Sequence, residues 1–186
     1  MDENRTPNWD DDGPVRPPRF TWKDADRAWN EWGCNCGPSA IAAICGLTLD
    51  EVRPHMGDFE KKRYTNPTLM WSALRSIGVC FTYRGGHLGI GAWPRHGLAR
   101  IQWEGPWTDP GANPRWAYRQ THWVAAARHN GEIGIFDVNA IGNGSGWCLL
   151  EHWADEIVPW IIREAVPRAN GKWHITHSVE VEATND

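Results

Sequence analysis

The hydrophobic pattern of this sequence changes its period at Gly78. Before that residue apolar side chains recur at helical spacing, and we expect helices over 22–33, 38–47, 49–56 and 65–77. After it, short β-rich runs are separated by glycine, proline and asparagine, and we expect strands over 79–83, 99–103, 122–127, 132–137 and 174–181. A last helix over 155–163 is expected to be interrupted by Pro159. Helices followed by strands predict an α+β fold, with a helical N-terminal half packed on an antiparallel β-sheet.

One turn fixes how two of the expected strands pair. Asn130-Gly131 lies between them, and this dipeptide is a strong signal for a two-residue hairpin. The hairpin places His122 and Asp137 on neighbouring strands.

Length and charge limit the classes of protein to consider. A chain of 186 residues is the usual size of one domain, which we place at 21–186 after an acidic, proline-rich arm over 1–20. The formal net charge of −4 gives no general attraction to nucleic acid, so no nucleic acid partner is expected. The apolar stretch 40–47 is too short to cross a membrane, and the first twenty residues lack a secretory leader. We therefore expect a cytoplasmic protein with no membrane partner.

Aromatic and arginine residues are unevenly distributed. Of the 21 aromatic residues 14 are tryptophan, so indole rings must fill much of the core, and some are expected to line a cleft. Residues 84–128 contain six arginines and two acidic residues. Such a segment forms either a set of solvated loops or a surface for a carboxylate-bearing substrate.

Cys36 stands directly before an apolar helical run. Unpaired N–H groups and the helix dipole at such a position stabilise a thiolate, which makes Cys36 a candidate nucleophile. His122 could act as its base and Asp137 could orient that base, while Asn30 could stabilise an oxyanion together with the N–H of Cys36. Alternatively Cys36 is a small buried residue and His122 a structural histidine.

These residues resemble a known family. Cys36-Gly37-Pro38, His122-Trp123-Val124 and Ile135-Phe136-Asp137 occur in the order seen in papain-like cysteine peptidases. Within that superfamily the chain most resembles the bacteriocin-processing peptidases of ABC exporters and their stand-alone relatives, over residues 30–140. The resemblance implies a papain-like fold, a Cys-His-Asp triad, and cleavage of a peptide or isopeptide bond in a protein or peptide substrate through a thioester. The segments ARIQWEGPW and GKWHITHSVEV are also similar in style to small proteins of bacterial viruses and prophages.

The sequence departs from the family pattern at several points. Asn30 stands where the family has glutamine, so Gln102 or Gln120 could supply the oxyanion donor instead. Asn139 points to the same side of a strand as Asp137 and could replace it as the third triad member. The segment 84–119 has no counterpart in the family, so its substrate does not carry over. We place four tryptophans nearest the cleft because they adjoin these residues in sequence: Trp32, Trp103, Trp107 and Trp123.

Two other functions use the same residues. A transglutaminase or glutamine deamidase would share the cysteine, histidine and aspartate, whereas a papain-fold binding or virion protein would keep Cys36 as a relic. Five cysteines favour free thiols over a disulfide framework; we expect Cys34 to have a loop role and the other three to lie in the core. No cofactor is expected, and the Cys34-x-Cys36 pair lacks the second pair of a structural zinc site, so no metal is expected.

Overall fold

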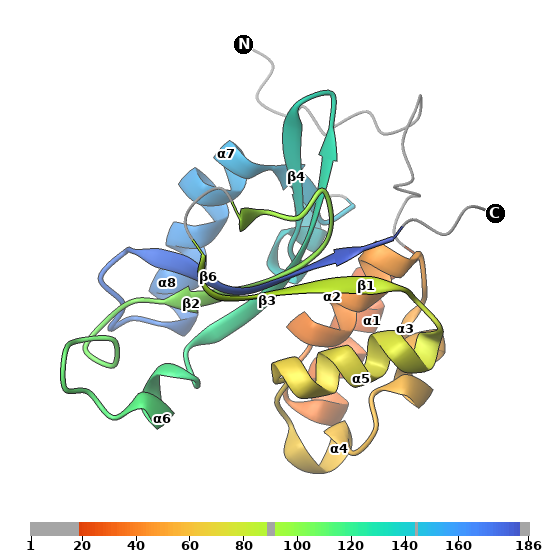
Figure 1. The fold of residues 1–186 in the computed structure, drawn as a ribbon, viewed down its shortest axis with the longest axis horizontal. Coiled ribbons are helices and arrows are strands. Elements are labelled where there is room, and N and C mark those ends of the chain that lie inside the picture. Colours follow the sequence, from red (N-terminus) through yellow and green to blue (C-terminus); the bar gives the residue numbers. More distant parts are fainter. Residues whose placement is uncertain (1–18, 89–91, 144, 183–186) are drawn as a thin grey trace.

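The computed structural model describes residues 19–88, 92–143 and 145–182. The arm predicted over 1–20 therefore lies almost wholly outside the described residues. A six-stranded antiparallel sheet in the order β1-β6-β2-β3-β4-β5 forms the centre of the molecule, and helices cover it (Figure 1). The expected α+β class is confirmed. None of the helices in the described ranges is both long and apolar enough to span a bilayer.

The strands are β1 (Phe81–Leu88), β2 (His96–Trp103), β3 (Thr121–His129), β4 (Glu132–Phe136), β5 (Trp147–Leu149) and β6 (Trp173–Val181). The α-helices are α1 (Trp22–Trp32), α2 (Cys36–Cys45), α3 (Leu49–Val52), α4 (Phe59–Lys62), α5 (Pro67–Ile77), α6 (Pro114–Ala117), α7 (Leu150–His152) and α8 (Val158–Ala165). The described residues also form the 3₁₀ segments η1 (Arg53–His55) and η3 (Val138–Asn143) and the π-helical turn η4 (Trp153–Ile157).

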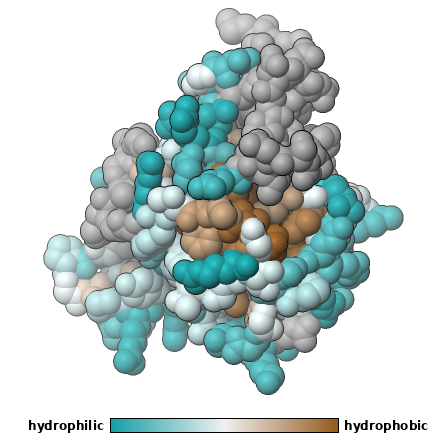
Figure 2. Space-filling model, turned by 45° about the vertical axis from the view of Figure 1, so that its right-hand side comes forward, coloured by the Kyte–Doolittle hydropathy of each residue, from teal (hydrophilic) through white to brown (hydrophobic). Residues whose placement is uncertain are grey.

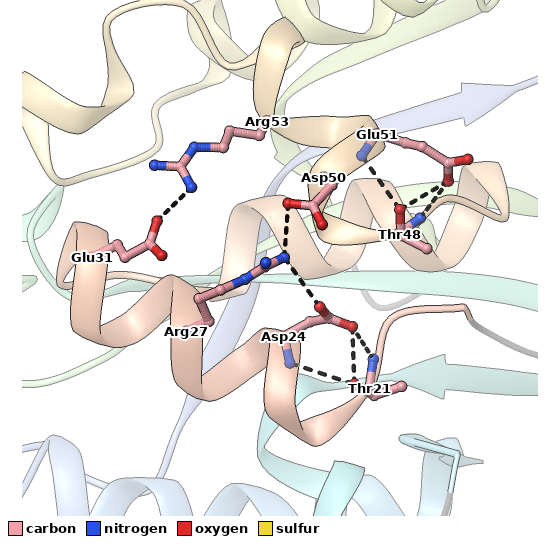
Figure 3. A network of polar contacts seen from close by, with 8 residues as sticks. All are labelled: Thr21, Asp24, Arg27, Glu31, Thr48, Asp50, Glu51 and Arg53. Carbon is pink, nitrogen blue, oxygen red and sulfur yellow. Dashed lines mark hydrogen bonds and ion pairs between the residues drawn. The ribbon is translucent and has the colours of Figure 1, made fainter.

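The helices begin and end where local signals place them. Thr21 and Thr48 each form a capping box, at the start of α1 and of α3, and the Asn66 side chain caps α5. Figure 3 shows that ion pairs then join α1 to the α3 region: Arg27 bonds Asp50 at 2.9 Å, and Arg53 bonds Glu31. These ion pairs hold α1 against α3 and η1 at the surface of the molecule.

The structure corrects several expected elements. Most strands are longer than predicted, and β5 was not predicted at all. Pro159 does not break the helical stretch, because α7, η4 and α8 follow one another without a gap; it lies at the start of α8, directly after the π-helical turn η4. Trp22 and Trp29 do not share the buried face of α1; they are exposed, and Ala25, Ala28 and Trp32 form that face.

Both faces of the sheet are buried. Trp123, Ala125 and Ala127 of β3 face a core shared with α1, α2 and α5, whereas Val124 and Ala126 face a second core shared with η4 and α8. The uninterrupted apolar run of β3 follows from this arrangement, since alternate side chains enter different cores. Figure 2 shows one side of the molecule, where apolar residues gather in one area bordered by hydrophilic ones.

The predicted hairpin joins β3 to β4. Asn130 (φ 49°) and Gly131 (φ 84°) both have positive φ, as a type I′ turn requires. The turn sets the register in which Ala125 lies opposite Phe136. As expected, His122 and Asp137 come from adjacent segments, although Asp137 lies just after β4 rather than within it.

Candidate active site

Helix α2 begins at Cys36, and the N–H groups of its first residues point to the sulfur atom of Cys34. Gly33 ends α1 in the left-handed conformation (φ 66°) and turns the chain toward α2. Asn35 precedes α2 but its side chain does not cap the helix; it donates to the carbonyl of Ala25 at 3.2 Å. The N–H groups of Cys36 and Gly37 instead lower the pKa of the Cys34 thiol. This helix terminus therefore stabilises negative charge at the site.

Gly37 makes close packing around the thiols possible. A Cβ atom at this position would collide with the Thr65 side chain, whose Oγ1 would lie 2.7 Å away. Thr65 is itself buried, and its carbonyl accepts a bond from the Trp123 indole at 3.4 Å. Glycine thus allows α2 to approach the segment before α5.

Two thiols share this terminus. The Sγ atoms of Cys34 and Cys36 are 3.9 Å apart. A hydrogen bond from the Cys36 thiol lowers the pKa of Cys34, burial opposes it, and the two backbone N–H groups and the charge of His122 lower it further, to about 6. The same thiol contact, burial and the charge on Cys34 raise the pKa of Cys36 well above its ordinary value. The pair therefore holds one proton and one negative charge near neutral pH, with the charge on Cys34.

His122 is bound to Asp137. Its Nε2 lies 2.9 Å from Asp137 Oδ2, and both side chains are buried. Burial lowers the pKa of His122, but the charge of Asp137 and its hydrogen bond outweigh burial, so the pKa is raised. Burial likewise raises the pKa of Asp137, and His122 together with other donors brings it below its ordinary value. An ionised Asp137 requires the proton on Nε2, which leaves Nδ1 of neutral His122 as a proton acceptor.

Further donors complete the shell of Asp137. The indole Nε1–H of Trp153 donates to Oδ2 at 2.8 Å, and both the backbone N–H and the side-chain amide of Asn139 donate to Oδ1 at 2.9 Å. Asn139 is farther from His122, with its Nδ2 3.5 Å from Nε2. Asp137 is thus the residue that orients His122, and Asn139 supports the carboxylate.

Tryptophan rings of the second core cover the His122–Asp137 pair. Trp103 stacks on His122 with centroids 6.0 Å apart, and on Trp153 with centroids 6.4 Å apart. Trp153 belongs to the π-helical turn η4, an irregularity frequently found at functional sites. The rings exclude water from the His122–Asp137 bond and so strengthen it.

The thiols and the histidine lie in one cleft of about 1220 Å³. Cys34, Cys36, His122 and Asn139 line it, together with residues of the α4–α5 and α6–β3 segments and of α8. A cleft of this volume accommodates several residues of a peptide. The structure therefore brings three of the four predicted polar residues together, with Asp137 behind His122.

Asn30 does not belong to this group. It is exposed on α1 and is not among the residues that line the cleft. The expected oxyanion role for Asn30 is therefore wrong. Two glutamines were the alternative oxyanion donors. Gln102 is buried, and its amide donates to the carbonyls of Trp103 and Gln120, whereas Gln120 lines the cleft. The spacing between Asn30 and Cys36 puts Asn30 on the helix before α2, but it does not determine the direction in which the Asn30 side chain points.

The four predicted tryptophans divide equally. Trp103 and Trp123 line the cleft, but Trp32 is buried against Phe59 in the first core. Trp107 is buried in the second core, where its indole donates to the Trp103 carbonyl at 2.7 Å. Adjacency in sequence is a weak guide for such residues. Trp29 and Trp160 are largely exposed and line the cleft instead.

One of the other three cysteines differs from expectation, and two residues of the cleft add to it. Cys148 is buried and Cys45 partly buried, but Cys80 is exposed rather than in the core. Cys34 lies in the loop between α1 and α2, as expected, and its thiol also lies against Cys36 in the cleft. Arg100 also lines the cleft, and only the surplus of arginines in 84–128 hinted at it.

Among the described residues, no three histidine, cysteine or acidic side chains form a group able to hold a metal ion. No family model and no curated protein match this sequence. Function is therefore inferred from the geometry of the site.

Proposed function

We propose that this chain is a cysteine peptidase-like hydrolase of papain-like fold, which cleaves a peptide or isopeptide bond through a thioester on Cys36. The observation that carries the proposal is the cleft that holds both a thiol pair at the N-terminus of α2 and the buried His122–Asp137 dyad. The Cys34 thiolate, whose pKa is low, can take the proton of Cys36 as the Cys36 sulfur attacks, and a histidine of raised pKa can protonate a leaving amine.

The first half of the cycle forms the thioester. Cys36 passes its proton to the Cys34 thiolate as its sulfur bonds to the substrate carbonyl carbon, whose oxygen becomes an oxyanion. The N–H groups at the start of α2 and the amide of Gln120 are the candidate donors to this oxyanion. Protonated His122 then gives its proton to the amine as the C–N bond breaks, which leaves an acyl-Cys36 and a neutral imidazole.

The second half restores the enzyme. Neutral His122 takes a proton from water at Nδ1 as the oxygen attacks the thioester, and the C–S bond breaks. The product acid leaves, the proton on Cys34 returns to Cys36, and His122 is again protonated. Asp137 remains ionised throughout, held by its four hydrogen bonds, and stabilises the imidazolium.

Alkylation by iodoacetamide tests for the activated thiol. The peptide carrying Cys34 and Cys36 is expected to react near neutral pH much faster than peptides carrying the other cysteines, and His122→Ala is expected to abolish this preference. Cys80→Ser, which removes an exposed thiol outside the cleft, is the matched control and should leave it intact. Equal, slow labelling of all five cysteines would contradict the proposal and favour a binding protein.

Incubation with denatured casein tests the reaction. New amino termini that require Cys36 and His122 support a hydrolase. Release of ammonia without new termini would refute hydrolysis and identify a deamidase or transglutaminase on the same residues.

A further inference from the structure

Arg100 is a buried cation that has no carboxylate counter-ion among the residues that the structure describes. It lies on β2, is only 3% exposed, and forms no ion pair with any residue that the structure describes. Its Nη2 donates to the Tyr118 carbonyl at 3.4 Å and to Thr121 Oγ1 at 3.2 Å. Its Nε and Nη1 are buried and have no hydrogen-bond partner within the described ranges. Such a group is costly unless a ligand completes it, since a buried charge is normally paired.

The position of Arg100 connects it to the thiol pair. The side chain lines the same cleft as Cys36 and lies near enough to interact electrostatically with the thiol pair. Pairing places Arg100 between Trp123 of β3 and His177 of β6, deep in the sheet. The ring of Tyr118, itself 61% exposed, lies 5.6 Å from the guanidinium carbon. An exposed side chain therefore covers the cation on the cleft side, and its displacement would open Arg100 to a ligand.

Apart from the thiol pair, the charged side chains that line the cleft in the described part of the chain do not neutralise Arg100. Glu164 is the acidic residue that lines it, but Glu164 is exposed on α8 and its Oε1 accepts from Arg163 at 2.8 Å. Arg63 and Arg119 also line the cleft and are positive. Burial lowers the pKa of Arg100, as expected for a cation that is removed from water without an adjacent carboxylate.

We propose that Arg100 is the receptor for a carboxylate of the substrate, so that the cleft selects peptides with a carboxylate close to the bond that is attacked. This inference depends on the proposed function, because it names the substrate class of the same site. A guanidinium with free N–H donors matches a carboxylate in charge and geometry. The carboxylate could be an aspartate or glutamate side chain or the free end of a peptide chain.

Iodoacetate and iodoacetamide separate this inference from the proposed function. Both alkylate thiols, but only iodoacetate carries a carboxylate. The ratio of their rates at the Cys34–Cys36 peptide, normalised to the ratio for glutathione, measures carboxylate recognition. We expect this ratio to fall about tenfold in Arg100→Gln, the loss expected for one hydrogen bond to a charged group. Arg119→Gln, which removes an exposed cation from the same cleft, should change it less than about twofold.

The outcomes are distinguishable. Fast labelling by iodoacetamide with an iodoacetate ratio that Arg100→Gln leaves unchanged would overturn the carboxylate receptor while the activated thiol stands. Slow, uniform labelling by iodoacetamide would overturn the proposed function itself. Arg100→Lys retains a cation and should keep part of the preference, which allows the test to proceed if Arg100→Gln does not fold.

Blocked peptides identify the source of the carboxylate. N-acetyl-Gly-Gly has a terminal carboxylate, N-acetyl-Gly-Asp-amide a side-chain carboxylate, and N-acetyl-Gly-Asn-amide none. Protection of the thiols from iodoacetamide by the first indicates recognition of a chain end, and protection by the second indicates an acidic side chain. Equal protection by the neutral peptide, or none by any of them, would count against the receptor.

Discussion

Replacing Cys36 with alanine is expected to raise the pKa of Cys34 from about 6 toward its ordinary value of 9.0. The hydrogen bond from the Cys36 thiol is the largest contribution that lowers this pKa, and alanine cannot provide it. The backbone N–H groups and His122 remain, so the rise is large but incomplete. The difference between a pKa of about 6 and 9.0 corresponds to about 4 kcal/mol between the two protonation states.

The expected change can be measured by the ultraviolet absorbance of thiolates. With a pKa of about 6, about 90% of Cys34 is ionised at neutral pH, whereas a thiol with its ordinary pKa is only about 1–3% ionised. The wild-type protein should therefore show an absorbance step near pH 6 that Cys36→Ala shifts to higher pH. Cys34→Ala should abolish this step and lower the pKa of Cys36, because the hydrogen bond and the charge of Cys34 are among the causes that raise it.

Cys80→Ser is the matched control, since it removes a thiol outside the cleft. A step near pH 6 that persists in Cys36→Ala, or that Cys80→Ser removes, would contradict the hydrogen bond assigned between the two thiols.

Four further predictions concern the residues around the thiols. Asp137→Asn removes the charge that raises the pKa of His122, so proton NMR should show the His122 titration at lower pH; an unchanged titration would contradict the assigned dyad. Trp153→Phe removes the 2.8 Å bond to Asp137 and should lower the free energy of unfolding in urea by about 2 kcal/mol, whereas Trp160→Phe, on an exposed ring, should change it little. Gly37→Ala forces a methyl group onto Thr65 and should cost about 1–3 kcal/mol in the same assay, while Gly142→Ala, which meets nothing within 4 Å, serves as its control. The alkylation rate of the thiol pair should rise as pH passes about 6, where Cys34 loses its proton. The rate of hydrolysis should fall again above the raised pKa of His122, where the acid for the leaving amine is lost. A rate of hydrolysis that only rises with pH would argue against His122 as that acid.

The parts of the fold predicted from sequence are those with local causes. The capping boxes of Thr21 and Thr48 and the Asn130-Gly131 turn are each specified within a few residues, and all are present. β5 was missed because it has only three residues and becomes a strand by pairing with β4. The lengths of β1 and β2 likewise depend on β6, which follows them by some 70 residues or more in the chain and pairs with both.

The candidate site shows the same division. His122 and Asp137 could be predicted to meet because one hairpin sets their register. Asn30 could not be excluded from sequence, since its exposure depends on which face of α1 the first core buries. Arg100 could not be identified either, because its burial results from the pairing of β2 with both β3 and β6.

The two-residue turn at Asn130-Gly131 also has a bearing on how the site could be lost. Successive residues of a strand point to opposite faces, so a shift of one position between β3 and β4 would turn Asp137 away from His122 and toward the opposite core. No side chain near the thiols would need to change. An inserted residue at this solvent-exposed tip that shifted the register would therefore separate His122 from Asp137, so the length of the loop determines the geometry of the dyad as much as any residue in the cleft.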